Sequence, residues 1–260
     1  MLRNLSSILL QTINLRDPAA RQRLTALIAQ LIPCHCQLCG MQSPQVLCSI
    51  CVRHYLSGPV ANPSRRCRYC AIPIATDDRA CGTCLQKRPA FDRTLVACDY
   101  IAPLDQLVLA LKFGRRLAIA PALAQMLAST LELPDSYPLP DILIPVPLSR
   151  QRLAQRGFNQ ALEIAKPLAR LTAIPLYPTL LQRVRDTTAQ TRLHPNQRLH
   201  NIAHAFALNS DYADKISNRH IGVVDDVMTT GATLHEIAAC LKRQGAQRVT
   251  NIVFARTPPH

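Results

Sequence analysis

The chain has 260 residues and a formal net charge of +14, with 30 lysines and arginines against 16 aspartates and glutamates. That length allows one large domain or two smaller ones. A hydrophobic content of 48% is sufficient for a core, which must be mostly aliphatic because aromatic residues make up only 4%. So basic a chain favours anionic partners: nucleic acid, pyrophosphate or an anionic membrane surface. No run of about 18 apolar residues occurs, so no transmembrane helix is expected.

Residues 1–33 are predicted to form an N-terminal amphipathic helix. Four apolar side chains recur there at helical spacing: Leu24, Leu27, Ile28 and Leu31. The longest apolar run near the start, Ile8–Leu10, is too short for the core of a signal peptide. We therefore expect a cytoplasmic protein whose first helix packs on the body of the fold, with docking to a partner as the alternative.

Four C-x-x-C pairs follow, and they are the strongest indication of metal binding. Two thiolates at this spacing reach one ion, and two such pairs complete a structural tetrahedral zinc site. Because the region has few large hydrophobic side chains, bound metal would supply its folding free energy. We predict two zinc sites, most simply in sequence order, from Cys36, Cys39, Cys48, Cys51, Cys67, Cys70, Cys81 and Cys84. Cross-braced pairing stays open, and a disulfide framework or a redox pair is the alternative.

Basic and aromatic residues within the cysteine-rich region indicate a surface for nucleic acid. An arginine beside a tyrosine can neutralise phosphates while the ring stacks on bases. The alternative is a purely structural ribbon with solvated basic faces. The nucleic-acid candidates in this region are Arg65, Arg66, Arg68 and Tyr69.

A strand is predicted over residues 93–101, followed by one helix from Pro103 and a second over residues 118–131. Lys112 and Arg115 lie at the end of the first helix, beside Phe113. They are candidates for an anionic ligand, although basic residues also simply favour a helix C-terminus.

An apolar strand over residues 141–147 ends in prolines and precedes three arginines, Arg150, Arg152 and Arg156, and a helix to about Leu171. Cations at the start of a helix oppose its dipole, so a solvated helix start explains these arginines poorly. We expect them to face a diphosphate or a nucleic-acid backbone.

Residues 181–206 are polar, rich in Arg and Gln, and lack a strong periodicity. Long segments of this kind within compact domains are usually lids or binding loops. We interpret the part between Arg183 and Arg198 as a lid, with Arg183, Arg192 and Arg198 as its candidate ligand-binding residues.

Residues 221–234 carry the most specific chemistry. A β-branched run typical of a buried parallel strand ends in Asp225 and Asp226, and a Thr-Thr-Gly-Ala-Thr turn then opens a helix. Ligands of open α/β sheets bind beyond the carboxyl ends of the strands, and such a turn suits a phosphate. The two carboxylates would hold sugar hydroxyls or a cation beside it; a strand–turn–helix joint without a ligand is the alternative. A helix over residues 232–244 and a strand over 248–255 complete an α/β alternation with a parallel sheet.

This segment resembles the phosphoribosyl pyrophosphate (PRPP) signature of type I phosphoribosyltransferases. The resemblance implies that Asp225 and Asp226 contact the ribose hydroxyls, with Mg²⁺ bridging these and the diphosphate. It implies a loop for the 5-phosphate, formed by Thr229, Thr230, Gly231, Ala232 and Thr233. It also implies a diphosphate loop, formed by Val146, Pro147, Leu148, Ser149 and Arg150.

Several segments, taken in order, resemble the ComF family (ComFC and GntX-like proteins) over about residues 34–257. They are the cysteine-rich ribbon, Leu-Lys-Phe-Gly, Pro-Val-Pro-Leu, Arg-Gly-Phe-Asn-Gln, the Gln190–Asn201 loop and the terminal Asp-Asp-Val-Met-Thr-Thr-Gly-Ala-Thr. The resemblance implies an α/β fold, with a type I phosphoribosyltransferase-like parallel sheet flanked by helices over residues 89–260. A small Cys-rich domain, a double zinc ribbon, would precede it over residues 34–88.

The resemblance further implies a competence-type role in natural transformation. In that role the protein binds imported single-stranded DNA and PRPP, together with other competence and DNA-uptake proteins. An active phosphoribosyltransferase with an unknown acceptor and a PRPP-sensing regulator without turnover are the alternatives. The sequence assigns no catalytic residue, so turnover stays open.

Overall fold

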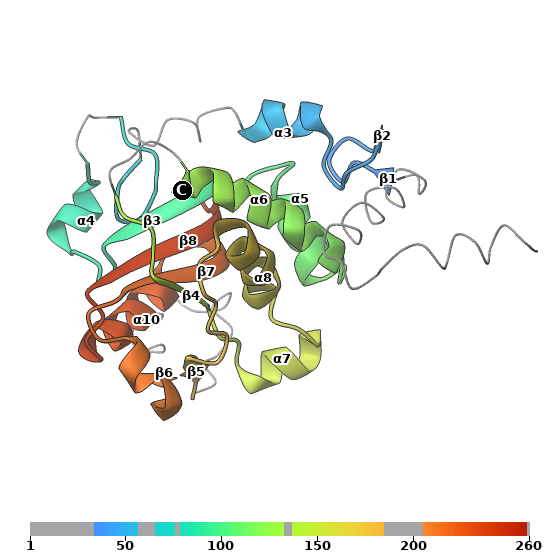
Figure 1. The fold of residues 1–260 in the computed structure, drawn as a ribbon. Coiled ribbons are helices and arrows are strands. Elements are labelled where there is room, and N and C mark those ends of the chain that lie inside the picture. The colour runs from blue at the N-terminus through green and yellow to red at the C-terminus, as the bar shows by residue number, and fades with distance from the viewer. Residues whose placement is uncertain (1–33, 57–65, 76–78, 133–136, 185–204, 259–260) are drawn as a thin grey trace, which may run out of the picture. The chain divides into compact units, whose positions relative to one another are not determined.

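A four-stranded parallel sheet forms the centre of the fold in the computed structural model (Figure 1). The structure describes residues 34–56, 66–75, 79–132, 137–184 and 205–258. The strands lie in the order β3 (Arg93–Asp99), β8 (Arg248–Arg256), β7 (His220–Met228) and β4 (Ile142–Pro145). The two central strands are almost entirely buried, as expected for strands that are covered on both faces.

The register of the sheet determines which loops meet at its C-terminal edge. Pro145, the last residue of β4, pairs with Val224 of β7. On the other side of β7, Asp225 pairs with Val253 of β8. The loop after β4 therefore begins beside the acidic end of β7.

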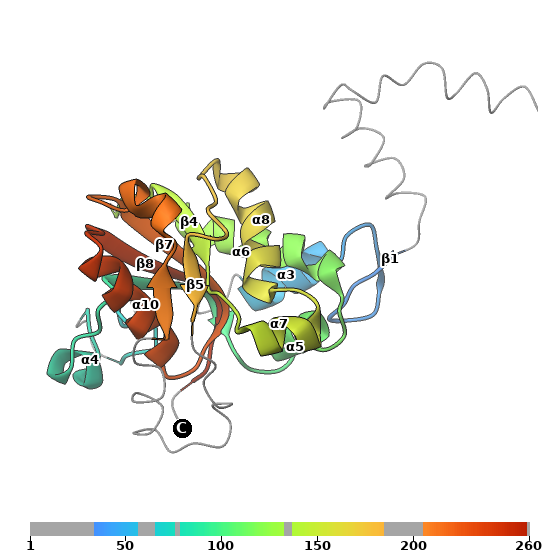
Figure 2. The same ribbon diagram turned by 90° about the horizontal axis from the view of Figure 1, so that it is seen from below.

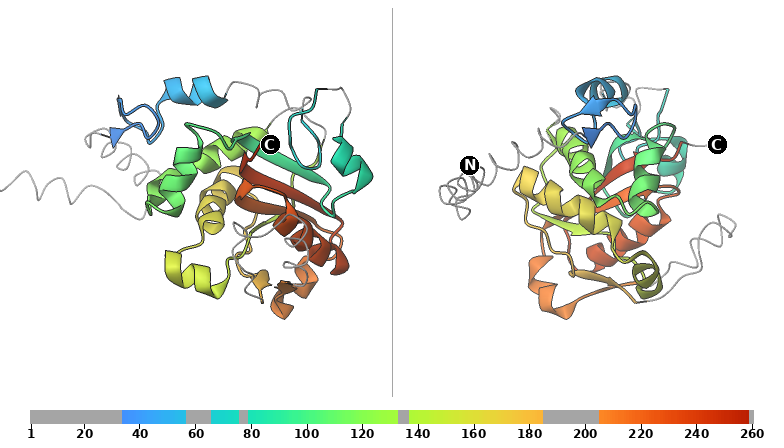
Figure 3. Two further views of the ribbon diagram at one scale, coloured as in Figure 1. Left: turned by 180° about the vertical axis from the view of Figure 1, so that it is seen from behind. Right: turned by 90° about the vertical axis from the view of Figure 1, so that its right-hand side faces the viewer.

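Helices cover both faces of the sheet, as Figures 2 and 3 show. On one face α6 (Ala120–Leu131) packs against α8 (Gln160–Thr172). On the other face α10 (Ala232–Arg243) contacts β8. Each helix buries apolar side chains at intervals of three and four residues, which is the pattern of a helix with one face on a core. This arrangement confirms the predicted α/β class.

The predicted order of strands and helices is confirmed, and one helix differs. The helix expected after Pro103 is α5 (Asp105–Lys112), and the 3-10 turn η3 (Leu117–Ile119) precedes α6. Residues 150–172 form two helices, α7 (Arg150–Arg156) and α8, because Gly157 adopts a φ of 83° that ends α7. Arg156 therefore lies in the last turn of a helix, where a cation is favourable. The dipole argument made from the sequence is wrong for Arg156.

The two cysteine-rich regions belong to different compact units, which divide between Val52 and Arg53. In the first unit, β1 (Cys34–His35) pairs antiparallel with β2 (Gln42–Ser43), and α3 (Ser49–Leu56) begins. The second cysteine-rich region contains α4 (Gly82–Gln86) and lies in the same unit as the sheet.

The second cysteine-rich region is bonded along β3. The N–H group of Thr94 in β3 donates to the carbonyl oxygen of Arg68 at 3.0 Å. The Arg66 guanidinium forms two hydrogen bonds of 2.9 Å with the carboxylate of Asp99. Tyr69 and Cys70 pack against the main hydrophobic core. The second cysteine-rich region therefore packs against the sheet.

A two-stranded antiparallel ribbon follows α8 in sequence, formed by β5 (Leu181–Arg183) and β6 (Phe206–Leu208). The 3-10 helix η5 (Ser210–Lys215) follows β6. The segment that joins the two strands, residues 185–204, lies outside the described residues and includes the lid candidates Arg192 and Arg198. Arg65 and the helix predicted over residues 1–33 also lie outside them.

Candidate functional site

Two aspartates lie at the C-terminal end of β7. Asp226 is buried and Asp225 is half-buried. The Oδ2 atom of Asp226 lies 2.7 Å from the Nζ atom of Lys112, the last residue of α5. The Oδ1 atom of Asp225 accepts a hydrogen bond from the N–H group of Asp226, and the Oδ1 atom of Asp226 accepts one from Val227, both at 2.9 Å. These contacts fix both carboxylates at the edge of the sheet.

The acidic pair is electrostatically unbalanced. Burial of the Asp225 carboxyl group and the charge of Asp226 raise the pKa of Asp225 well above its ordinary value, and Lys112 opposes that rise. Lys112 and Arg156 offset part of the negative charge, but the raised pKa of Asp225 indicates that the two carboxylates still repel each other in a poorly solvated position. A divalent cation that binds carboxylate oxygens would relieve this repulsion.

The loop of residues 229–233, the predicted phosphate loop, joins β7 to α10. Thr229 and Thr230 are exposed, whereas Gly231 and Ala232 are buried. Gly231 has a φ of 79°, and a Cβ atom there would lie 2.4 Å from the Cε atom of Met228, so the position requires glycine. The loop leads directly into the first turn of a 12-residue helix, where N–H groups lack intrahelical acceptors. This loop has the chemistry of a phosphate site.

The loop after β4, the predicted diphosphate loop of residues 146–150, lies against the acidic end of β7. The N–H group of Val146 donates to the carbonyl oxygen of Val224 at 2.9 Å. The Asn159 side chain donates from Nδ2 to the carbonyl oxygen of Val146 at 3.0 Å. Ser149 is buried and caps α7, because its Oγ atom accepts from the N–H group of Arg152 at 3.3 Å. Arg150, the last residue of the predicted loop, is exposed in the first turn of α7.

Cationic and aromatic side chains from two helices gather beside the acidic pair. The Cζ atom of Arg156 lies 5.8 Å from the centroid of the Phe113 ring, which is 72% exposed. Arg156 also donates from Nη1 to Oε1 of Gln160 at 2.5 Å. Burial lowers the pKa of Arg156, and the carboxylate of Asp226 opposes that effect. The structure thus brings Lys112 and Arg156 to the acidic pair, while Arg115 is exposed in the following turn.

The eight cysteines of the C-x-x-C pairs form two groups in sequence order. The possible ligand atoms within each group lie within 4.8 Å of one another. Thiolates bound about 2.3 Å from a tetrahedral zinc ion lie about 3.8 Å apart. The Sγ atoms of Cys39 and Cys48 are 3.8 Å apart, and those of Cys70 and Cys81 are 3.7 Å apart. All eleven cysteines are free thiols, so the structure favours metal coordination over the disulfide framework.

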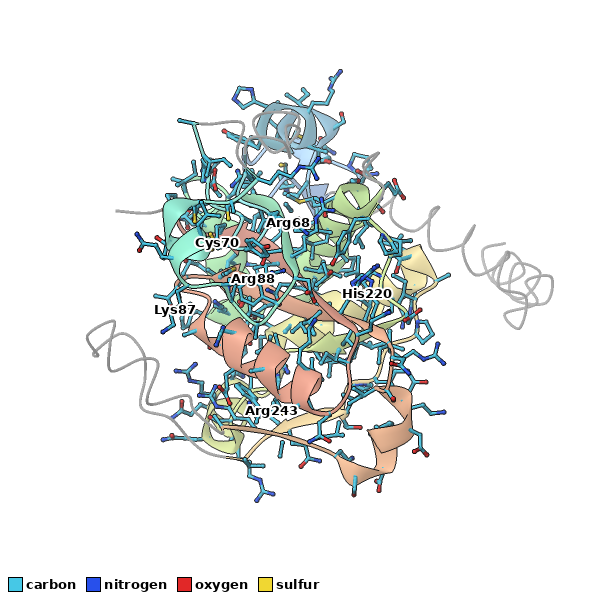
Figure 4. All side chains as sticks on the ribbon, turned by 90° about the vertical axis from the view of Figure 1, so that its left-hand side faces the viewer. Arg68, Cys70, Lys87, Arg88, His220 and Arg243 are labelled. Atoms are coloured by element: carbon cyan, nitrogen blue, oxygen red, sulfur yellow. The ribbon has the colours of Figure 1, made fainter. Side chains whose placement is uncertain are left out.

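Two arginines lie within cation–π distance of the Tyr69 ring, beside the second cysteine group. The Cζ atoms of Arg68 and Arg88 are each 5.3 Å from the centroid of this ring. Figure 4 shows Arg68, Arg88 and Lys87 in the same part of the molecule as Cys70. Arg66 does not join this surface, because its side chain is 9% exposed and paired with Asp99. Its role is structural.

The structure adds two arginines, Arg88 and Arg256, to the candidate residues identified from the sequence. Arg88 completes the stack on Tyr69, and its position four residues after a C-x-x-C pair gave a weak signal. Arg256 is buried at the end of β8 and donates to the carbonyl oxygens of Cys70 and Met228. A charged residue that ends a buried apolar strand was the signal for Arg256. Arg183, a lid candidate, lies at the end of β5 with its Cζ atom 5.7 Å from the centroid of the Phe206 ring.

Comparisons with known proteins agree with this geometry. A family model described as "Phosphoribosyl transferase domain" matches residues 158–259. The chain is 37% identical over 232 residues to the DNA utilization protein YhgH of Salmonella typhi, covering 87% of this chain and 98% of the relative. It is 32% identical over 206 residues to Competence protein F of Haemophilus influenzae, covering 78% and 87%. It is 33% identical over 117 residues to Competence protein ComFC of Bacillus subtilis, covering 45% of each.

Within the described ranges, no helix is long and apolar enough to span a bilayer. The two cysteine groups, the parallel sheet and the similarity over most of the chain all agree with the resemblance found in the sequence. The chain belongs to the ComF family of DNA-utilisation and competence proteins, with a type I phosphoribosyltransferase fold.

Proposed function

We propose that this protein is a competence-type factor for natural transformation and DNA uptake that binds PRPP and single-stranded DNA. One observation carries the proposal: an acidic pair and two loops converge at one edge of the sheet, in a chain whose relatives are named for DNA utilisation and competence. We assign it to the cytoplasm, where free thiols persist, with other DNA-uptake proteins as partners.

PRPP binding would use each part of this edge for one part of the ligand. Asp225 and Asp226 would accept hydrogen bonds from the ribose hydroxyls, because ionised carboxylates are acceptors only. The loop of residues 229–233 would bind the 5-phosphate with its N–H groups and threonine hydroxyls. The loop of residues 146–150 would hold the diphosphate, whose charge Arg152 and Lys112 can balance.

Magnesium fits the donor set of this edge. Mg²⁺ prefers carboxylate and phosphate oxygens, and when bound it would neutralise charge on the diphosphate and orient the ribose. The mutual repulsion of Asp225 and Asp226, seen in the raised pKa of Asp225, supports that assignment. Lys112 pairs with one carboxylate oxygen of Asp226, so a cation that binds this oxygen would release the ammonium group toward the diphosphate.

An active phosphoribosyltransferase is the second candidate, and the exposed ring of Phe113 favours it. Phe113 directly follows Lys112, which pairs with Asp226, and Arg156 lies on the ring. A planar acceptor stacked on this ring would lie beside the PRPP site. Release of pyrophosphate from PRPP, measured with free nucleobases and with single-stranded DNA, tests turnover. Binding without release in every mixture would favour the third candidate, a PRPP-sensing regulator.

Binding of single-stranded DNA would use the stacked arginines and tyrosine beside the second cysteine group. Bases stack on aromatic rings without regard to sequence, and arginines neutralise the phosphates between them. Arg68, Tyr69 and Arg88 supply both elements on one surface. The lid candidates Arg183, Arg192 and Arg198 would extend the basic surface or close over PRPP.

Zinc is the ion we assign to the two cysteine groups. Four thiolates in tetrahedral array are the ligand set of a structural zinc site, and the Sγ separations of 3.8 Å and 3.7 Å suit it. A role in holding the local fold is expected, because structural zinc sites contribute folding free energy directly.

Calorimetric titration of the full chain with PRPP and Mg²⁺ tests the ligand assignment. We expect the wild type to bind and an Asp225→Asn/Asp226→Asn variant to lose binding by at least about tenfold, since two charge-assisted contacts disappear. An Asp211→Asn variant is the matched control, because Asp211 is exposed on η5. Equal affinity in wild type and double variant would reject the site.

Fluorescence anisotropy with a labelled single strand tests the DNA assignment. An Arg68→Gln/Arg88→Gln variant should bind more weakly and with a smaller dependence on salt, because each lost phosphate contact removes released counterions. The matched control, Arg170→Gln/Arg243→Gln, removes the same charge from exposed positions on α8 and α10. Equal weakening of DNA binding in both variants would mean that only the net charge matters, and it would reject the assignment of DNA binding to this surface.

A further inference from the structure

One buried arginine connects the second cysteine group with the end of β7. Arg256 is 8% exposed. Its Nε atom donates to the carbonyl oxygen of Cys70 at 2.8 Å. Its Nη1 atom donates to the carbonyl oxygens of Met228 at 3.1 Å and of Thr229 and Thr257 at 2.5 Å each. A single guanidinium group thus holds a metal-ligand residue and the first residue of the predicted phosphate loop.

Both the hydrogen bonds and the charge of Arg256 connect it to the second cysteine group. Four hydrogen bonds of its guanidinium go to main-chain carbonyl oxygens. Burial lowers the pKa of Arg256, and the side chains of Cys70, Asp99 and Cys81 oppose that effect. A buried cation is costly, and the side chains of Cys70 and Cys81 offset part of that cost, which links the charge of Arg256 to the second cysteine group. The planar guanidinium has a fixed geometry, so the two sides of the bridge are mechanically linked.

On the loop side, the bridge fixes the direction of N–H groups. A peptide unit is rigid and planar, so a carbonyl that is held in place also fixes the N–H group that follows it. Hydrogen bonds to the carbonyls of Met228 and Thr229 therefore fix the N–H groups of Thr229 and Thr230. Both residues belong to the loop assigned to the 5-phosphate. Strand pairing ends at Met228, and Arg256 holds the chain beyond it.

On the metal side, Cys70 is a ligand residue whose carbonyl position depends on coordination. Its Sγ atom lies 3.7 Å from that of Cys81, a spacing that a shared ion maintains. Without the ion, four thiols at this distance have no common attraction, and small metal domains lose order when the metal leaves. The carbonyl of Cys70 would then move, and the guanidinium with it.

We propose that Arg256 is a positioning residue for PRPP, which transmits the state of the second metal site to the loop of residues 229–233. The metal held by Cys67, Cys70, Cys81 and Cys84 would thereby set the affinity for PRPP. This inference rests on the proposed PRPP binding. The inference assigns an influence on PRPP binding to the second cysteine group, because Arg256 donates its hydrogen bond to the carbonyl oxygen of Cys70 in that group.

A double-mutant cycle on the full chain tests the bridge. Arg256→Met removes the guanidinium, Cys81→Ser removes one ligand of the second metal site, and native mass spectrometry counts the bound metal. Each variant should weaken PRPP binding about tenfold, as expected for loss of about one charge-assisted hydrogen bond to the loop. The double variant should be no weaker than either, because both break one path. Additive weakening of about a hundredfold would overturn the proposal.

Reciprocity supplies a readout that a merely structural arginine would not change. If the metal improves PRPP binding, PRPP must improve metal retention by the same factor. PRPP should therefore slow zinc release to a chromophoric chelator in the wild type, and Arg256→Met should abolish the slowing. The control Arg243→Met, at an exposed position of α10, should behave like the wild type. Equal slowing in wild type and Arg256→Met would overturn the proposal.

Hydrogen exchange distinguishes failure of this inference from failure of the proposed function. In the absence of any ligand, Arg256→Met and Cys81→Ser should each speed amide exchange in residues 229–233 relative to Arg243→Met. If the wild type does not bind PRPP, the proposed function fails, and this exchange measurement still decides the bridge. Unchanged exchange in Cys81→Ser would overturn it. If circular dichroism finds Arg256→Met unfolded, Arg256→Lys replaces it throughout, since lysine keeps the charge and loses the fork.

Discussion

Replacing Lys112 with methionine should destabilise the ligand-free protein through the acidic pair. The Nζ atom of Lys112 lies 2.7 Å from Asp226, and the two side chains are 21% and 4% exposed. Removing one partner of a buried ion pair costs about 3–5 kcal/mol, because the remaining charge is uncompensated. Arg156 also acts on Asp226 and compensates part of the charge. We therefore expect a loss of about 2–3 kcal/mol in the free energy of unfolding near neutral pH.

Urea denaturation of three variants measures this loss. Lys166→Met is the matched control, because Lys166 forms a 2.6 Å pair with Glu163 while its side chain is 45% exposed. Exposed pairs of this kind contribute about 0.2–1 kcal/mol. Adding Asp226→Asn to Lys112→Met should recover more than half of the loss, since asparagine leaves no unpaired charge.

The loss of stability in Lys112→Met should depend on pH. Asp225 already has a raised pKa, and loss of Lys112 removes the cation that opposes the rise. A carboxyl group whose folded pKa exceeds its unfolded pKa contributes stability that is present at low pH and lost as pH rises through the folded pKa. The deficit of Lys112→Met should therefore shrink as pH falls. Stability equal to that of Lys166→Met at neutral pH, or a deficit that does not change with pH, would show that Lys112 does not compensate the acidic pair.

Three further predictions follow from the same site. Gly231→Ala should lose about 1–3 kcal/mol of stability, because of the φ of 79° and the contact with Met228, and should bind PRPP more weakly. Thermal denaturation measures the loss, with Gly82→Ala as the control, because a Cβ atom there would meet nothing within 4 Å. Equal stability of the two variants would contradict the prediction. Elemental analysis of the purified protein should find two zinc ions per chain, as the two cysteine groups require, and one or none would be contrary to that assignment. Binding of Mg²⁺ and PRPP at mildly acidic pH should release a proton, because a bound cation lowers the raised pKa of Asp225, and affinity should fall as pH decreases. Calorimetry in two buffers of different ionisation enthalpy detects the proton, Asp225→Asn should abolish its release, and release unchanged in that variant would exclude Asp225 as its source.

The sheet and its acidic edge could be predicted because their signals are local. The apolar run of β7 ends at two carboxylates, so the pattern itself indicates a buried strand with a polar end. Gly231 adopts a left-handed conformation at the start of α10. Glycine is scarce in this chain, with eight residues in 260, so a glycine at this position indicated a required backbone conformation. The C-x-x-C spacing likewise indicates which cysteines can share an ion, and the structure groups the cysteines in sequence order.

The contacts between distant segments could not be predicted in the same way. The pair of Lys112 with Asp226 and the burial of Arg66 against Asp99 depend on which side chains the fold brings together. Arg256 is harder still, because its partners are main-chain carbonyls, which every residue possesses and no sequence pattern marks. The sequence placed Arg156 at a helix start because the stop at Gly157 was not recognised.

The attachment of the second cysteine-rich region to β3 has a consequence for how the chain can be divided. β3 is the outer strand of the sheet on that side, and the carbonyl of Arg68 accepts from one of its N–H groups. Exposed strand edges invite pairing with other chains, and natural proteins cover them. A shortened chain beginning at residue 89 would lose this cover together with the buried side chain of Ala71. Such a fragment should self-associate through its open edge, so we expect the second cysteine-rich region also to prevent edge-to-edge association of the sheet.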